Sequence, residues 1–229
     1  MPTGPDLPRV LDALQRVHGK PKPPPTTDPL ELVLWENVAY LADDERRAEA
    51  FRALKKRVGT RPEQILAARA GVLFDIARAG IMPAGSSEKL RRTAAIALEQ
   101  FGGDLKAAAK RPLSEARKAL MKFPSVGAPG AEKILLLSGS HPVLALDSNG
   151  LRVLLRLGHG REAKSYAATY RSAQEAAAAQ LPPGDAGLIR AHLLLRHHGQ
   201  TLCRRSRPRC EACPVTNVCV YYRRATGRR

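Results

Sequence analysis

The sequence predicts an all-α protein, and three observations carry that prediction. Aromatic residues make up only 4% of the 229 residues, whereas alanine, leucine and arginine, which favour helices, recur throughout. Apolar residues return at helical spacing and almost never alternate with polar ones, as they would in a half-buried strand. Glycines and prolines separate most of the helical stretches. We therefore expect about nine or ten helices.

Most expected helices begin or end at a recognisable signal. An amphipathic stretch at 7–17 precedes a proline-rich run at 20–25, which predicts an extended connector. Asp28 before Pro29 provides a cap and a first-turn proline for a helix that runs to about residue 42, and Asp43 begins the next helix. The remaining helices are expected at 61–69, 72–79, 87–101, 113–122, 148–157, 162–181 and 185–198.

The composition favours a polyanionic partner. Lysine and arginine number 38 against 21 aspartate and glutamate residues, so the formal net charge is +17. A hydrophobic fraction of 44% is enough to support a core and excludes a disordered chain. No apolar run could cross a membrane, and the first residues lack the pattern of a signal peptide. We expect a cytoplasmic protein.

All four cysteines lie close together near the end of the sequence. A disulfide framework would spread its cysteines through the fold, so the cluster predicts one metal site. The spacing contains only one short Cys-x2-Cys pair, which favours a 4Fe-4S cluster, with structural zinc as the alternative. The proposed ligands are Cys203, Cys210, Cys213 and Cys219. Between the first two stand Arg204, Arg205, Arg207 and Arg209, which predict a phosphate-contacting surface.

A tight turn separates the helix that ends near Lys122 from one that begins near Ala128. The turn reads Phe123-Pro-Ser-Val-Gly127. Backbone N–H groups exposed at the start of a helix favour a bound phosphate. A plain corner between two helices is the alternative.

These segments resemble the endonuclease III family of helix-hairpin-helix DNA glycosylases with an iron-sulfur cluster loop. The resemblance rests on the cysteine spacing with its lead-in 195–203, on the turn, where the family has Leu-Pro-Gly-Val-Gly, and on 144–155; it covers about 29–222. It implies a two-domain all-α fold with a DNA cleft. Residues 29–139 would form a helical barrel with the helix-hairpin-helix at about 113–137, and 1–28 plus 140–229 would form the cluster domain.

The resemblance also implies two catalytic carboxylates. Asp147 stands in a Leu-Asp-x-Asn-x-x-Arg-Val-Leu segment that is closest to the monofunctional adenine and thymine mismatch glycosylases. It would stabilise the positive charge that develops on the deoxyribose, although a helix cap is the alternative role. Glu36, in a helix that is apolar nearly all round, falls where that branch has a catalytic glutamate. It would protonate the departing base or activate water, and a salt-bridged glutamate is the alternative.

The sequence departs from the family pattern at three places. Pro129 occupies the position of the lysine that forms a Schiff base in bifunctional members, so we expect weak or no AP-lyase activity. Lys133 lies about a helical turn further on and is not expected to substitute. Tyr40 and Leu41 stand where the family has an intercalating glutamine, and an apolar wedge could serve instead. The resemblance implies further DNA contacts from Ser125, Val126, Gly127 and Gly130, of which Ser125 replaces a glycine.

The function expected is therefore a monofunctional DNA glycosylase of base excision repair that leaves an abasic site in double-stranded DNA. Because the chain ends ten residues after Cys219, uracil or thymine mismatches are favoured over adenine, whose glycosylases carry an extra domain. Adenine, oxidised-base and alkylated-base glycosylases remain alternatives, as does a non-catalytic DNA-binding protein on the same scaffold. We expect a nucleoid-associated monomer.

Overall fold

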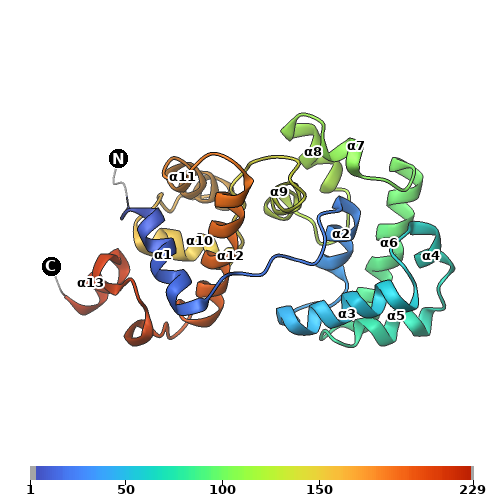
Figure 1. The fold of residues 1–229 in the computed structure, drawn as a ribbon, viewed down its shortest axis with the longest axis horizontal. Helices are drawn as coiled ribbons and strands as arrows, with labels where there is room; N and C mark the ends of the chain where they lie inside the picture. Colours follow the sequence, from blue (N-terminus) through green and yellow to red (C-terminus); the bar gives the residue numbers. More distant parts are fainter. Residues whose placement is uncertain (1–3, 228–229) are drawn as a thin grey trace. The chain divides into compact units, whose positions relative to one another are not determined.

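The protein is all-helical, as the sequence predicts. The computed structural model describes residues 4–227, and within that range it contains α-helices and 3-10 turns but no strand (Figure 1). The α-helices are α1 (Leu7–His18), α2 (Pro29–Asn37), α3 (Asp44–Arg57), α4 (Pro62–Ala67), α5 (Ala70–Ala77), α6 (Pro83–Phe101), α7 (Lys106–Ala109), α8 (Leu113–Leu120), α9 (Ala128–Leu137), α10 (Ser148–Leu157), α11 (Tyr166–Ala178), α12 (Asp185–Thr201) and α13 (Val220–Thr226). The 3-10 helices are η1 (Cys210–Ala212) and η2 (Thr216–Val218).

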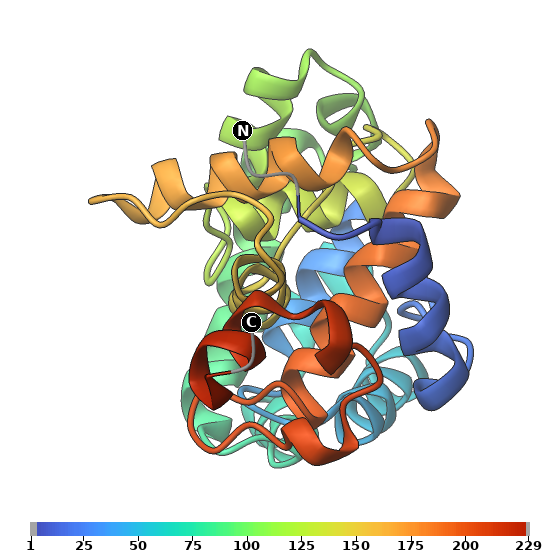
Figure 2. The ribbon, with the colours of Figure 1, turned by 90° about the vertical axis from the view of Figure 1, so that its left-hand side faces the viewer.

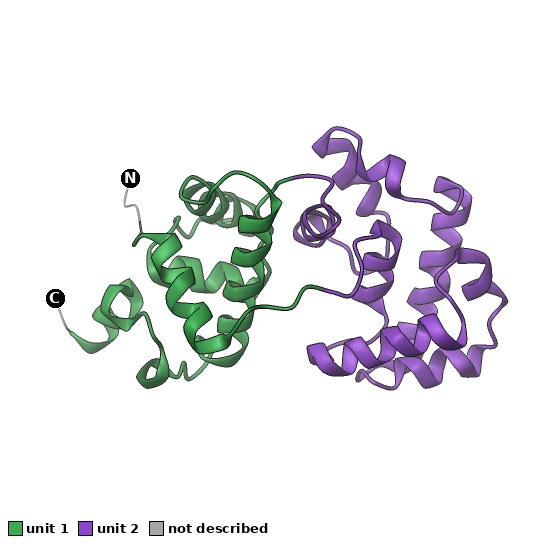
Figure 3. Ribbon diagram, in the orientation of Figure 1, with its two compact units in different colours: residues 1–23, 142–229 green, residues 24–141 purple. Residues whose placement is uncertain are grey.

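The chain forms two compact units (Figure 3). Unit 1 combines the described residues up to Pro23 with those from Pro142 onward, and unit 2 is the continuous segment Pro24–His141. Unit 1 therefore contains α1 and α10 to α13, and unit 2 contains α2 to α9.

Unit 1 is organised around α10 and α12. These two helices pack against each other, and α1 lies beside α12 (Figures 1 and 2). The close approach depends on Gly199 in α12, because a Cβ at this position would lie 2.7 Å from the Asn149 backbone oxygen. The core of the unit is built from leucines such as Leu11 and Leu154. The glycine thus brings α12 directly against the first turn of α10.

Unit 2 is built around α6, which contacts α2, α4 and α5. Helix α2 is buried on most faces, as its apolar sequence predicts, and Leu32, Val33 and Leu34 have almost no exposed surface. Asp28 caps α2 by accepting hydrogen bonds from the N–H groups of Leu30 and Glu31 at 3.0 and 3.1 Å. Helices α8 and α9 pack against each other as a helical hairpin.

Helix α2 is shorter than the sequence predicts, because it ends at Asn37 rather than near residue 42. A contact distant in sequence holds the chain that follows: the Ile81 N–H donates to the Tyr40 backbone oxygen at 3.1 Å. A Cβ on Gly80 would lie 2.5 Å from the Tyr40 nitrogen, so only glycine permits this approach. Leu41 adopts a left-handed backbone with φ of 54°.

Three other differences from the expected helices are local. The short helices α7 and α13 were not expected, and the predicted helix at 162–181 begins only at Tyr166 because Ser165 caps it. Gly158 and Gly160 both have positive φ and form the turn before it.

In the described part of the chain, no helix is long and apolar enough to cross a membrane.

Candidate active site and cysteine loop

Asp147 lies at the N-terminus of α10 and caps it. Its Oδ1 accepts hydrogen bonds from the N–H groups of Asn149 at 3.0 Å and Gly150 at 2.7 Å, and its Oδ2 accepts from the Asn149 amide at 3.1 Å. Its side chain is half-buried, and the Arg196 Nε lies 3.7 Å from Oδ2. The capping role is therefore real, and it fixes the orientation of a carboxylate that remains accessible.

Tyr166 lies near this carboxylate. Partial burial, and then the negative charge of Asp147, raise the pKa of the Tyr166 hydroxyl. The ring is exposed and lies beside Tyr170. The carboxylate of Asp147 thus lies at a polar surface of unit 1 rather than in its core.

Glu36 is held by a lysine from another helix. The Lys133 Nζ of α9 donates to the Glu36 Oε2 at 2.6 Å, and the two side chains are 18% and 19% exposed. A charge-assisted hydrogen bond this short fixes both groups. Glu36 is therefore neither a solvated surface residue nor a fully buried charge.

The turn between α8 and α9 is anchored to α2. The Asn37 side-chain amide donates to the Pro124 and Val33 backbone oxygens, each at 3.0 Å, which ties the turn to the end of α2. Phe123 is buried and stacks on Phe101. Ser125 adopts a left-handed backbone with φ of 62°, the conformation that glycine tolerates best.

The start of α9 carries the other residues predicted to contact DNA. Gly127 is the N-cap, and no side chain caps the helix. Val126 is buried, and a Cβ on Gly130 would lie 3.7 Å from its Cγ1. Pro129 lies in the first turn, where it fits without strain. Lys133 stands one turn further along the same face, at i+4 from Pro129.

A small polar cavity of unit 2 brings several of these residues together. It has a volume of about 190 Å³ and is lined by Glu36, Asn37, Tyr40, Leu41, Arg47, Ser86, Lys89 and Ser125. Three buried polar atoms of the residues that line it have no hydrogen-bond partner in the described part of the chain: Asn37 Oδ1, Arg47 Nε and Ser86 Oγ. Unsatisfied polar atoms are rare in protein interiors, so this cavity is suited to a polar ligand.

An exposed apolar surface lies next to the cavity. Leu41 is 67% exposed, and Ile81 and Met82 are 67% and 57% exposed, although all three are large apolar residues. Ile81 is joined to Tyr40 by the backbone hydrogen bond described above. Tyr40 and Leu41 were identified from the sequence, whereas Ile81 and Met82 were missed. An apolar pair between a glycine and a helix-starting proline was the signal available.

The four cysteine thiols are all free and lie in the loop between α12 and α13. Among the described residues, no three His, Cys, Asp or Glu side chains are grouped so that they could hold a metal ion. The thiols nevertheless affect one another. Burial raises the pKa of the Cys213 thiol to about 11, and the charges of Cys203, Cys219 and Cys210 add to that increase.

Two arginines of α10 attach the cysteine loop to unit 1. The Arg156 guanidinium donates to the Cys203 Sγ at 3.3 Å and to the Arg204 and Arg205 backbone oxygens at 2.8 and 3.1 Å. Arg152 donates to the Cys203 backbone oxygen at 3.0 Å. These bonds order a polar loop before any metal is considered. The loop arginines proposed to contact DNA, which are Arg204, Arg205, Arg207 and Arg209, are all exposed.

A buried histidine, which the sequence did not indicate as part of the site, also contacts the loop. His198 Nε2 lies 3.5 Å from the Cys213 Sγ, and its Nδ1 lies 3.0 Å from His18 Nε2. Burial, and then the nearby His18 and His197, lower the pKa of His198 to about 4. His198 is therefore neutral at physiological pH and fills the space between α1 and the loop.

The two helical units, the α8–α9 hairpin and the cysteine loop agree with the two-domain all-α fold that the sequence predicts. No protein-family model matches the chain. It is 26% identical to endonuclease III of Thermotoga maritima over 198 residues, 86% of this chain and 85% of that protein. It is 24% identical to a thymine/uracil-DNA glycosylase of Methanothermobacter thermautotrophicus over 141 residues, 61% of this chain and 58% of that protein.

The fold agrees with these relatives. A trapped endonuclease III–DNA covalent intermediate superposes with a TM-score of 0.73 at 19% identity, covering 96% of this chain and 97% of that one. These relatives and solved structures support the endonuclease III superfamily of helix-hairpin-helix DNA glycosylases as the family of this chain.

Proposed function

We propose that the protein is a monofunctional DNA glycosylase that hydrolyses the N-glycosidic bond of a mismatched or damaged base and leaves an abasic site. The observation that carries the proposal is the combination of two oriented carboxylates, Asp147 and Glu36, with a proline at position 129, where a nucleophilic lysine is absent. Water is then the nucleophile that completes the reaction, and the deoxyribose keeps both of its phosphodiester bonds.

Asp147 is proposed to stabilise the transition state. Loss of a base leaves positive charge on the deoxyribose C1′, and a fixed carboxylate beside it lowers the barrier. The cap bonds from Asn149 and Gly150 orient Asp147 without neutralising it. Both N–H groups move with α10, so the carboxylate needs little reorganisation when charge develops.

Glu36 is proposed to act as the general acid or general base. It either protonates the departing base or accepts a proton from the attacking water. Lys133 holds its carboxylate in place through the 2.6 Å contact. This contact also engages the Lys133 ammonium, which supports the view that Lys133 does not act as a free amine. The AP-lyase activity is accordingly proposed to be weak or absent.

A thymine or uracil opposite guanine is the substrate we favour. Lys89 and Arg47 provide donors at the cavity of unit 2, and the Asn37 Oδ1 and Ser86 Oγ provide buried oxygens without partners. Guanine pairs acceptors at O6 and N7 with N–H donors at N1 and N2, and arginine and lysine are its commonest protein partners. The likeness to the Methanothermobacter thymine/uracil-DNA glycosylase supports the same choice.

The exposed apolar residues are proposed to wedge open the duplex. Tyr40, Leu41, Ile81 and Met82 present apolar surface to solvent beside the cavity. Apolar side chains inserted between base steps unstack them and help to extrude a nucleotide. The turn residues from Ser125 to Gly130 and the loop arginines are proposed to hold the phosphates.

A 4Fe-4S cluster is the cofactor we propose for Cys203, Cys210, Cys213 and Cys219. Four free thiols lie in one loop, near enough to raise one another's pKa, and their spacing contains only one short Cys-x2-Cys pair, which favours a 4Fe-4S cluster over zinc. When bound, the cluster would cross-link the loop and add folding free energy. The thiols must lose their protons on loading, so loading is expected to be favoured by alkaline pH.

The test is a panel of labelled duplexes that contain uracil, mismatched thymine, adenine opposite oxidised guanine, hypoxanthine or alkylated bases. Strand breaks that appear only after alkali, and that disappear in Asp147→Asn, would support the proposal and identify the base. Duplex binding without base release from any substrate would instead favour the non-catalytic DNA-binding protein. The left-handed backbone of Ser125 in the turn, where the family has glycine, supports that alternative.

A further inference from the structure

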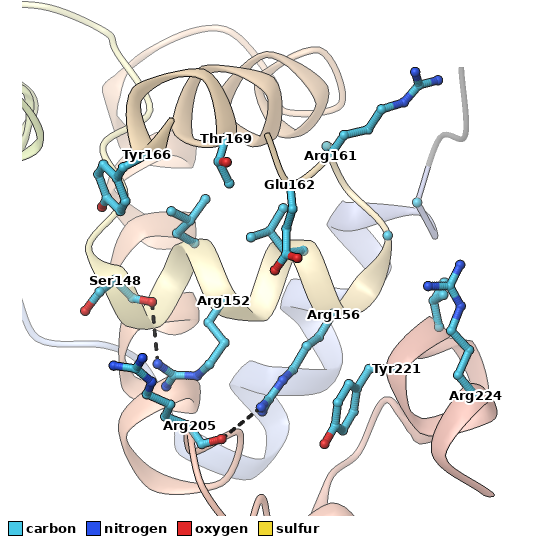
Figure 4. Close-up of a pocket in the computed structure, with 16 residues that line it drawn as sticks. Ser148, Arg152, Arg156, Arg161, Glu162, Tyr166, Thr169, Arg205, Tyr221 and Arg224 are labelled. Atoms are coloured by element: carbon cyan, nitrogen blue, oxygen red, sulfur yellow. Dashed lines mark hydrogen bonds between the residues drawn. The ribbon is translucent and has the colours of Figure 1, made fainter. Parts of the chain in front are cut away.

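A second, larger groove lies within unit 1. It has a volume of about 1000 Å³ and runs along α10 between the start of α11, the cysteine loop and α13 (Figure 4). One end lies at Ser148, next to Asp147, and the other reaches Arg161 and Arg224. Its floor includes the apolar side chains of Leu151, Leu155 and Val220. The site is distinct from the cavity of unit 2, and of the roles proposed above only the phosphate contact of Arg205 involves one of its lining residues.

The groove is strongly cationic. Five arginines line it, which are Arg152, Arg156, Arg161, Arg205 and Arg224, and Glu162 is the single acidic residue among its lining residues. The first two are rigid, because they are bonded to backbone oxygens of α10, α12 and the cysteine loop.

The other three arginines have exposed side chains. Within the described residues, the guanidinium groups of Arg161, Arg205 and Arg224 form no hydrogen bond or ion pair. Figure 4 shows Arg205 near the Ser148 end and Arg161 and Arg224 at the opposite end. Positive charge is therefore available at both ends of the groove, and phosphate groups are the partners that suit it.

Two tyrosines flank the same groove. Tyr166 is 53% exposed at the Ser148 end, and Tyr221 is 38% exposed near Arg224. The Arg156 guanidinium lies 4.4 Å from the centre of the Tyr221 ring, which fixes that ring in place. Exposed aromatic rings in a basic groove are how proteins bind unpaired nucleotides, since each base stacks on a ring while its phosphate meets a cation.

We propose that this groove binds a segment of single-stranded DNA. Its phosphates lie on Arg161, Arg205 and Arg224, and its bases stack on Tyr166 and Tyr221. The inference goes beyond the glycosylase activity, because it requires neither a lesion nor base release. Glu162 points into the groove in Figure 4. Its negative charge repels the phosphates and therefore weakens the binding.

The experiment measures binding of a short, fluorescein-labelled oligothymidylate to the full chain by anisotropy. The double variant Arg161→Ala/Arg224→Ala is expected to bind at least about tenfold more weakly, and the slope of its salt dependence is expected to fall by about 0.7 for each phosphate that is no longer neutralised. The matched control is Arg16→Ala/Arg171→Ala, which removes the same charge from exposed positions of unit 1 outside the groove. The control is expected to change affinity by less than about twofold.

Variants of two further residues separate base stacking, and the local charge of Glu162, from the effect of net protein charge. Tyr166→Ala is expected to weaken binding by about tenfold while Tyr166→Phe retains it, because stacking needs the ring and not the hydroxyl. Glu162→Gln is expected to strengthen binding by a few fold, because it removes the opposing charge. A blunt duplex of the same sequence is measured beside the single strand.

Three results would overturn the proposal. The first is no binding of oligothymidylate by the unaltered protein. The second is equal weakening in the groove and control double variants, which would reduce the effect to net charge. The third is an equal loss of affinity for single strand and duplex, which would make the groove part of the duplex-binding surface. Since oligothymidylate contains no lesion, none of these results depends on whether the glycosylase proposal holds.

Discussion

The two candidate catalytic carboxylates are held in different ways. Asp147 is oriented by the N–H groups of the helix that it caps, two and three residues further along the chain. Glu36 is oriented by Lys133, which lies 97 residues away in sequence. The first arrangement is local and belongs to the backbone of α10, whereas the second depends on the packing of α2 against α9. A local cap survives conservative substitution, but a tertiary ion pair can be broken by changing either partner.

Asp147→Asn gives the largest expected effect and tests the carboxylate that is oriented locally, by the backbone of α10. Asparagine caps a helix about as well as aspartate, so the free energy of unfolding is expected to change by less than about 0.5 kcal/mol. The negative charge is removed, however, and single-turnover base release is expected to fall by about 10²- to 10³-fold. Quantification of base release on a denaturing gel after alkali measures this.

The matched control is Asp43→Asn, at the cap of α3, where Asp43 accepts a hydrogen bond from the Arg46 N–H at 2.8 Å. It is expected to leave base release unchanged. If both cap variants lose activity equally, Asp147 acts through helix stability rather than through its charge.

Lys133→Gln tests the carboxylate that is oriented by a tertiary contact, Glu36. Removing the ammonium takes away the 2.6 Å ion-pair contact of a half-buried carboxylate, and the free energy of unfolding is expected to fall by about 1–2 kcal/mol. Base release is expected to fall by about tenfold because Glu36 loses its fixed position. Denaturant unfolding and single-turnover kinetics measure the two effects, and Lys122→Gln is the control. Lys122 donates to the exposed Gln100 side chain and is expected to matter little.

A double variant sharpens this result. If Lys133 acts only through Glu36, the double variant Glu36→Gln/Lys133→Gln should release base at the same rate as the single variant Glu36→Gln. Reductions that multiply would show that Lys133 has a separate role. That outcome would break the comparison, because Lys133 would no longer be only the group that orients Glu36.

Acid is expected to destabilise the unit that contains Asp147 through a buried histidine. His159 has no exposed surface, and neither ring nitrogen has a hydrogen-bond partner in the described part of the chain. Burial lowers its pKa below the unfolded value of about 6.5. The unfolded state therefore binds the proton more tightly, and the free energy of unfolding should fall by up to about 1.4 kcal/mol per pH unit below pH 6.5.

Chemical denaturation of the unaltered protein and of His159→Phe, at several pH values, measures this decrease. The contribution of His159 should be fully present above pH 6.5 and should decrease toward its lower folded pKa. The unfolding free energy of the unaltered protein minus that of His159→Phe should therefore become more negative on acidification, because only the unaltered protein must keep a buried imidazole unprotonated in order to fold. A pH-independent difference would show that the His159 ring is not held neutral by its surroundings.

Ser125→Gly gives the smallest expected effect. Ser125 has φ of 62°, where an L residue carries a steric penalty that glycine avoids. Relief of that strain is partly offset by the greater freedom of glycine in the unfolded chain, so stability should rise by about 0.5–1 kcal/mol. The melting temperature and denaturant midpoint measure this, and Ser87→Gly, inside α6, should destabilise instead. A destabilised Ser125→Gly would mean that the serine side chain makes a necessary contact.

What the sequence could predict follows the same division. The helix at 148–157 was predicted with the observed bounds, and its cap by Asp147 was the alternative role considered, because capping depends on neighbouring residues. The end of α2 was predicted about five residues too late, because Gly80 and Ile81 hold the chain at Tyr40 from another part of the fold. The pairing of Glu36 with Lys133 was open in sequence, since no local pattern states that the lysine of α9 reaches α2. The unpaired polar atoms around the 190 Å³ cavity belong to three separate segments and had no sequence signal.

The most direct test of a glycosylase that uses two carboxylates and no amine is borohydride trapping on a duplex with uracil opposite guanine. We expect base release that is revealed by alkali, with no covalent protein–DNA adduct after borohydride treatment. A trapped adduct that forms at the rate of base release would contradict this mechanism. If that adduct were absent in Lys133→Gln, Lys133 would be the amine, and Pro129 would no longer indicate monofunctional chemistry.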